Sequence, residues 1–244
     1  MYVFTLLFLG GWGFFALFWA VLRVLDGQYL AFFALLGLAA FCFGIAVQSW
    51  RVRSRKVVPD GRFDADGTTL LPDRWFNISL QIATTGLVLA MALIAAFVPL
   101  HKLDLPMPGP PTSWMVITFA AAGALYGLPL VINNLRHRTT KYLRMTPEGV
   151  QIYEGRSPVT AKWDQVRAVG GGDTLRDPSQ VTKLVVSIDG GKAATLSGGA
   201  FTVEGTALRD LVRFYWKHPE SRPELTNGEA LVRLNRAAHA PKAM

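Results

Sequence analysis

Long apolar stretches separated by short polar ones fill the first 140 residues of the chain. Four of them, residues 2–25, 29–50, 75–100 and 114–135, contain no charged residue apart from Arg23. An α-helix rises ~1.5 Å per residue, so about 20 apolar residues cross the ~30 Å hydrocarbon core of a bilayer. The pattern therefore predicts four transmembrane helices in a membrane domain of residues 1–140.

The basic residues between these stretches predict how the helices are oriented. Ten Lys and Arg residues lie in residues 51–74 and 136–144, whereas residues 23–28 and 101–113 contain only two. Loops on the cytoplasmic side of a membrane carry the excess of positive charge. We therefore expect a multi-pass protein with both its N-terminus and its C-terminus in the cytoplasm.

A different pattern begins after residue 140. Short runs rich in β-branched and aromatic residues, bounded by Gly, Pro and Asp, are typical of strands. The candidate strands are residues 141–146, 150–154, 159–169, 183–188 and 192–196. An amphipathic helix follows, for which Thr202 is the expected N-cap and Pro219 the stop. This pattern predicts an α+β domain at residues 141–218, with an antiparallel sheet or partly open barrel capped by one helix.

The remaining residues, 219–244, form a C-terminal tail. Residues 228–237 within it are amphipathic. Two interpretations stay open for this piece: a last helix packed on the domain, or a partly ordered tail.

Two segments of the predicted domain carry a resemblance. Residues 142–150 read Tyr-Leu-Arg-Met-Thr-Pro-Glu-Gly-Val, and residues 163–169 read Trp-Asp-Gln-Val-Arg-Ala-Val. The chain resembles small bacterial membrane proteins with a C-terminal PH-like domain, in which a Tyr-x-hydrophobic-Thr-x-x-Gly strand and turn precede a Trp-x-x-hydrophobic strand. The resemblance implies a PH-like fold and the plasma (inner) membrane. A complete PH-like sheet would need about two more strands than the sequence indicates.

Composition adds a constraint on partners. The chain is 51% hydrophobic and 17% charged, with a formal net charge of +8. Its basic clusters directly follow apolar stretches, which favours a membrane surface over nucleic acid as the partner. Seven basic residues are candidates for contact with lipid head groups, either as topology determinants or as a specific anionic-lipid site. They are Arg51, Arg53, Arg55, Lys56, Arg136, Arg138 and Lys141.

A stripe of polar residues follows one face of the third stretch, and two asparagines lie at the matching depth in the fourth. These side chains could line a pocket for a lipid head group or a partner helix. Alternatively, they hydrogen-bond between helices, which is worth ~0.6 kcal/mol per pair. The stripe consists of Asn77, Gln81, Thr84, Thr85, Asn133 and Asn134.

The fourth stretch also contains a ridge of small residues, which lets two helix backbones approach closely. The ridge consists of Ala120, Gly123, Ala124 and Gly127. It predicts either packing within the chain or the seam of a homodimer.

The sequence predicts no catalytic, cofactor or metal site. Asp64, Asp66 and Gly67 resemble part of a calcium loop, but Arg62 occupies the first ligand position, so a solvated turn is favoured. No Cys and His spacing suits zinc, and no nucleophile has a base nearby in the pattern.

The function that these features favour is non-enzymatic. We expect a scaffold or accessory subunit of a membrane protein complex, whose PH-like domain contacts a partner protein, anionic lipid or both at the cytoplasmic face. The expected partners are membrane lipids and another membrane protein or a second copy, but not nucleic acid. The alternative is a small transporter or lipid-handling enzyme that uses the polar stripe.

Overall fold

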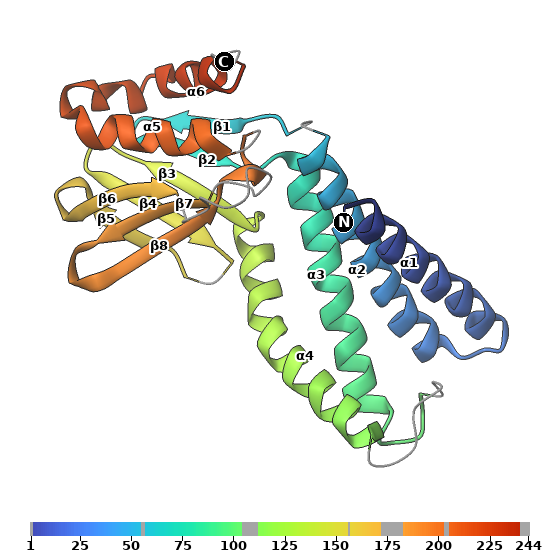
Figure 1. The fold of residues 1–244 in the computed structure, drawn as a ribbon. Coiled ribbons are helices and arrows are strands. Elements are labelled where there is room, and N and C mark those ends of the chain that lie inside the picture. The colour runs from blue at the N-terminus through green and yellow to red at the C-terminus, as the bar shows by residue number, and fades with distance from the viewer. Residues whose placement is uncertain are drawn as a thin grey trace. The chain divides into compact units, whose positions relative to one another are not determined.

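The computed structural model describes residues 2–54, 57–103, 112–155, 157–171, 183–202 and 205–239. It divides into two compact units, each built from two segments of chain (Figure 1). The helical unit is Met1–Trp50 with Ile78–Arg138, and the β-unit is Arg51–Asn77 with Thr139–Met244. The chain therefore passes between the two units three times.

Four long helices are the main feature of the first half of the chain. They are α1 (Tyr2–Leu25), α2 (Tyr29–Arg53), α3 (Arg74–Phe97) and α4 (Thr112–His137). Within the described residues, these four helices are long and apolar enough to cross a membrane, as predicted. Large apolar side chains such as Phe4 and Leu125 are 70% and 76% exposed. Such exposure is costly in water but not in hydrocarbon, so the helices are compatible with a multi-pass membrane protein.

Small residues bring α2 and α3 together in the helical unit. A Cβ added to Gly86 would lie 2.6 Å from the carbonyl oxygen of Gly37, and one added to Gly44 would lie 2.6 Å from that of Ser79. Both distances are shorter than van der Waals contact allows, so only glycine fits at these crossings.

The ridge on α4 also packs inside the chain. Gly123 faces Met91 of α3 and Gly127 faces Val88, each so closely that an added Cβ would overlap the side chain opposite. Ala120 of the same ridge is buried. Packing against α3 therefore occupies the small-residue surface of α4.

The β-unit contains two antiparallel sheets among its described residues. The first has the order β1-β2-β3-β4-β5 and the second the order β6-β7-β8. The strands of the first sheet are β1 (Asp60–Asp64), β2 (Gly67–Leu71), β3 (Lys141–Met145), β4 (Gly149–Glu154) and β5 (Val159–Lys162). Those of the second are β6 (Val166–Gly171), β7 (Lys183–Ile188) and β8 (Lys192–Ser197).

The hairpin of β1 and β2 belongs to the β-unit, whereas the sequence pattern places residues 60–71 in the predicted membrane domain of residues 1–140. Thr68, Thr69 and Leu70 pair with Met145, Arg144 and Leu143 of β3. Strand β2 is short, but Gly67, Thr68 and Leu70 in it are buried. Its alternating pattern covers too few residues to stand out in the sequence.

The predicted strand at 159–169 is interrupted. A 3-10 turn at Trp163–Gln165 separates β5 from β6. The Gln165 side chain accepts a hydrogen bond from the Lys162 N–H at 3.1 Å, and the buried Trp163 donates through Nε1 to the carbonyl of Thr146 at 2.9 Å. These bonds end the pairing of β5 with β4 and direct the chain toward β6 of the second sheet.

The helix after β8 begins later than predicted. Helix α5 (Thr206–Lys217) starts after Gly205, whose φ of 72° ends the preceding turn. Thr202 is buried and its hydroxyl has no hydrogen-bond partner among the described residues, so it is not the N-cap. The helix ends before Pro219 as expected, and it packs against β6 and α6 (Figure 1).

The C-terminal segment is folded onto the domain. A 3-10 segment (Pro219–Leu225) leads to α6 (Glu229–His239), in which Ala230 and Leu234 are buried. Arg233 donates three hydrogen bonds to the Glu224 carboxylate, at 2.8, 2.9 and 3.2 Å, and the hydroxyl of Tyr215 donates to the same carboxylate at 2.9 Å. Burial, followed by this hydrogen bond, raises the pKa of Tyr215, so the hydroxyl remains a donor. A packed last helix is therefore the correct interpretation.

Candidate functional site

The most extensive polar cluster in the β-unit surrounds the first turn of α3. Asp73 lies just before this helix, and its side chain is 5% exposed. Its carboxylate accepts hydrogen bonds from Arg51 Nε at 3.0 Å and Arg51 Nη2 at 2.9 Å. It also accepts the backbone N–H of Phe76 at 3.0 Å, which is the side-chain contact of a helix N-cap.

Two further contacts join Asp73 to other parts of the β-unit. The N–H of Val58 donates to its carboxylate at 3.4 Å. The N–H of Asp73 itself donates to the carbonyl of Ala200 at 2.9 Å. One acidic residue thus joins the end of α2, the start of α3 and the turn that follows β8.

Asn77 connects the same turn of α3 to the start of β3. Its side-chain oxygen accepts the backbone N–H of Thr140 at 2.8 Å and the Thr140 hydroxyl at 2.9 Å. Thr140 lies between the end of α4 and the start of β3 and is 3% exposed. We call Arg51, Asp73, Asn77 and Thr140 the junction cluster, because they join all three chain passages between the units.

The sequence contained a signal for part of this cluster. Arg51 directly follows the second apolar stretch, and Asp73 lies two residues before the third. Both are therefore recognisable in the sequence as charged residues beside apolar stretches. The sequence does not show their pairing, because 21 residues separate them and no local pattern links them. Tertiary contacts decide which charges at helix ends are buried and paired.

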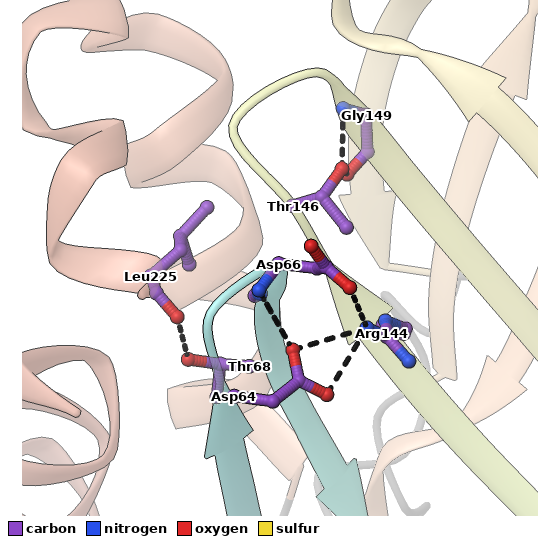
Figure 2. A network of polar contacts seen from close by, with 8 residues as sticks. Asp64, Asp66, Thr68, Arg144, Thr146, Gly149 and Leu225 are labelled. Carbon is purple, nitrogen blue, oxygen red and sulfur yellow. Dashed lines mark hydrogen bonds and ion pairs between the residues drawn. The ribbon is translucent and has the colours of Figure 1, made fainter. Parts of the chain in front are cut away.

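A second polar network closes the turn between β1 and β2 (Figure 2). Asp64 accepts the backbone N–H groups of Asp66 and Gly67 at 3.0 and 2.9 Å, and Arg144 of β3 donates to both of its carboxylate oxygens at 3.1 Å. The Thr68 hydroxyl donates to the carbonyl of Leu225 at 2.5 Å. Asp64 and Asp66 therefore stabilise the hairpin, and the described residues contain no group of acidic, His and Cys side chains that could hold a metal.

The seven basic candidates for lipid contact fall into three groups. Arg51 is paired with Asp73, and Lys141 is paired with Glu154 at 2.6 Å. Arg136 and Arg138 are exposed. The side chain of Arg53 and the whole of Arg55 and Lys56 lie outside the described residues.

The polar stripe is not a continuous lining. Asn77 belongs to the junction cluster, and the Thr84 hydroxyl donates to the Leu80 carbonyl of its own helix at 2.9 Å. Thr85 is exposed, whereas Asn134 is buried and Asn133 partly so. The amide nitrogen of Gln81 is buried and has no hydrogen-bond partner among the described residues.

Two cavities lie outside these clusters, and the sequence indicated neither. One, of about 430 Å³, is bounded by the start of β5 and the turn between β7 and β8. The other, of about 400 Å³, lies between the α1–α2 turn and the residues after α3. Both form only when segments distant in sequence come together.

Comparison with known proteins does not assign this arrangement to a family. No protein-family model matches the chain, and comparisons with curated proteins and with solved structures found no match either. Inference about function therefore depends on the geometry of the chain itself. The junction cluster consists of paired and hydrogen-bonded groups, an arrangement that holds chain segments together.

Proposed function

We propose that the chain is a membrane-anchored interaction protein, a scaffold or accessory subunit whose β-unit binds a partner protein at the cytoplasmic face. The supporting observation is the β1–β2 hairpin, which lies between two apolar helices in sequence but pairs with β3. The β-unit is thereby connected to the helices at three points of the chain.

Three connections have a mechanical consequence. A domain on a single linker can rotate and explore many positions, whereas each further connection removes orientational freedom. The junction cluster lies within the β-unit and ties together the three points at which the chain enters or leaves it, through buried and partly buried hydrogen bonds. A domain restrained in this way meets partners in the same membrane at high effective concentration.

The hairpin also supports a PH-like identity for the β-unit. It supplies two strands that the resemblance required and that residues after 140 did not provide. Two antiparallel sheets closed by a helix after the last strand agree with that fold. A PH-like fold does not by itself determine the ligand, so the choice of partner rests on the surface.

The surface favours protein over lipid as the main partner. Arg51 and Lys141 are occupied by Asp73 and Glu154. Among the described candidates, Arg136 and Arg138 are exposed, and a basic residue near an anionic surface contributes only ~1 kcal/mol. Lipid contact would therefore add to a protein interface rather than replace it.

Site-specific photo-crosslinking in native membranes, followed by extraction in mild detergent, tests the proposal. A photoreactive residue at Val159 or Val232, which are exposed in the β-unit, should capture one recurring membrane-protein partner. The same residue at buried Leu143 is the matched control and should capture none. Recovery of a lone, uncrosslinked species from every exposed position would contradict a scaffold role.

One observation supports the alternative, a transporter or lipid-handling enzyme. The buried amide nitrogen of Gln81 has no hydrogen-bond partner within the described part of the chain, and a buried donor left without one costs ~1–3 kcal/mol. If it serves a cargo, Gln81→Leu abolishes transport or lipid turnover in reconstituted vesicles. If it serves none, the variant is fully folded, partner capture is unchanged, and this alternative fails.

A further inference from the structure

The cavity of about 400 Å³ in the helical unit combines two segments that are far apart in sequence. One wall is the turn between α1 and α2 with the first residues of α2, including Gln28 and Tyr29. The other wall is formed by His101 and Lys102, which follow α3. This end of the helices is remote along the chain from the junction cluster, so the cavity is independent of the function proposed above.

A defined helix ending positions His101 and Lys102. The N–H of Lys102 donates to the carbonyl of Phe97 at 3.1 Å, and that of His101 donates to Val98 at 3.0 Å. This hydrogen-bond pattern is a Schellman-type C-cap, which requires a left-handed residue. His101 adopts this conformation with φ of 53°, although a residue with a Cβ pays ~1 kcal/mol for it.

The next residue fixes the wall to the rest of the helical unit. Leu103 is 5% exposed and packs with Ala31 and Ala34 of α2. The two side chains that precede it are therefore held at the cavity, although both are exposed to solvent.

The opposite wall is also ordered by side-chain contacts. The guanidinium of Arg23 donates to the side-chain oxygen of Gln28 at 3.0 Å. This bond orients the Gln28 amide and leaves its NH₂ group as the donor. Gly27, with φ of 73°, allows the tight turn that brings Gln28 to the cavity.

The polar groups around the cavity share one property: they can donate hydrogen bonds. The lining residues are Lys102, His101, Tyr29 and Gln28, whose side chains carry an ammonium, an imidazole, a hydroxyl and an amide. Among the described residues, no carboxylate lines the cavity, and Asp26 of the same turn lies outside the lining. A lysine beside several neutral donors suits an anion with several acceptor oxygens.

We propose that this cavity binds a phosphate-type anion. The cavity lies where apolar helices end, so the anion can be the head group of a lipid at the membrane interface or a free phosphate from solution. Both sources offer the same oxygens to Lys102, His101 and Gln28.

Two binding measurements on the full chain separate these sources. Calorimetry in a neutral detergent, with inorganic phosphate as the probe, tests the free anion. Native mass spectrometry after release from nanodiscs of phosphatidylcholine with phosphatidylglycerol tests the head group, by counting the anionic lipids that stay bound. Binding in either measurement that depends on Lys102 supports the site.

Matched variants make the result specific. Lys102→Gln should weaken binding about tenfold, because it removes the one formal positive charge of the lining. Lys217→Gln, an exposed lysine of α5, makes the same charge change elsewhere and should have no effect. His101→Gly should also weaken binding while stabilising the fold, because glycine adopts the positive φ without strain.

The His101→Gly variant distinguishes loss of the site from loss of the fold. A higher thermal midpoint together with weaker binding assigns the effect to the imidazole. Absence of binding of both probes, or equal binding by the native protein and Lys102→Gln, overturns the proposal.

Discussion

Asp73 shows how a single buried charge can organise a chain junction. A buried carboxylate is costly unless it is paired and hydrogen-bonded. Here it has the bidentate Arg51 guanidinium and the N–H groups of Phe76 and Val58. Removing the carboxylate takes two hydrogen bonds from Arg51, which is only 20% exposed, and leaves the first turn of α3 without its cap.

We predict that Asp73→Ala destabilises the protein by about 3 kcal/mol, because one partner of a buried pair is removed. This corresponds to a fall of roughly 5–10 °C in the apparent melting temperature. The measurement is the monodisperse fraction after heating in detergent, followed by size-exclusion chromatography. Asp73→Asn should reduce the stability less than Asp73→Ala does, because the amide oxygen of asparagine still accepts the Phe76 N–H.

The matched control is Asp189→Ala. Asp189 pairs with Arg167, but these side chains are 44% and 70% exposed, so the loss of stability should be much smaller than for Asp73→Ala. Equal effects of Asp73→Ala and Asp189→Ala would mean that the junction pair contributes no more than a surface pair.

At the scale of elements, close contacts between helices determine how the helical unit is packed. Gly37 and Gly86 let the backbones of α2 and α3 approach each other, and Gly123 and Gly127 let α4 approach the side chains of α3. A homodimer through the same surface of α4 would have to displace α3. The sequence showed the ridge, and the structure identifies the helix against which it packs.

We predict that alanine substitutions at these glycines differ in cost according to the atom opposite. Gly37→Ala should be the most destabilising, because it meets the backbone oxygen of Gly86, which cannot move alone. Gly127→Ala should follow, because Val88 is stiff, and Gly123→Ala should cost least, because Met91 is flexible. Overpacking of this kind costs ~1–3 kcal/mol.

Thermal unfolding in detergent, monitored for each variant, checks this order. Gly10→Ala on α1 is the control, because no atom lies within 4 Å of the added Cβ, and it should be neutral or stabilising. A uniform gain in stability across all four variants would show that helix propensity rather than packing controls the outcome.

At the scale of the whole molecule, the β-unit is discontinuous in sequence. Its first sheet contains β1 and β2 from before α3 and β3 to β5 from after α4. Leu143 and Met145 of β3 have no exposed surface in the folded chain. Without the hairpin, β3 would become an edge strand and lose its pairing with β2.

We predict that residues 139–244 expressed alone do not fold, whereas residues 51–77 joined to 139–244 by a short Gly-Ser linker do. A short linker suffices because the side chain of Asn77 lies 2.8 Å from the Thr140 nitrogen. Dispersed amide resonances and slow hydrogen exchange in β3 and β4 would identify the folded form. A folded spectrum from residues 139–244 alone would show that the hairpin is dispensable.

Much of this architecture is encoded locally. The four apolar helices follow from uncharged runs of sufficient length, and their bounds lie close to the predicted ones. The strands β4, β7 and β8 and the buried face of α5 were visible as periodic patterns and turns. These features depend on residues near one another in sequence, so a pattern suffices to find them.

Other features depend on contacts between distant residues. The pairing of β2 with β3, the Arg51–Asp73 pair and the cavity beside Lys102 each combine segments separated by at least 20 residues. Thr202 lies in a suitable sequence position for an N-cap, but the turn at Gly205 starts the helix elsewhere. Local propensity is a weak prior that tertiary context overrides at such positions.

The sequence by itself determined that most of the first 140 residues need an apolar solvent and that the rest form strands and amphipathic helices. Hydropathy and periodicity are properties of single residues and their neighbours, so they can be read along the chain. Only the tertiary structure decided that residues 60–71 belong to the β-unit and which charges are buried in pairs. Burial and pairing are properties of residues brought together by folding, and no local pattern specifies them.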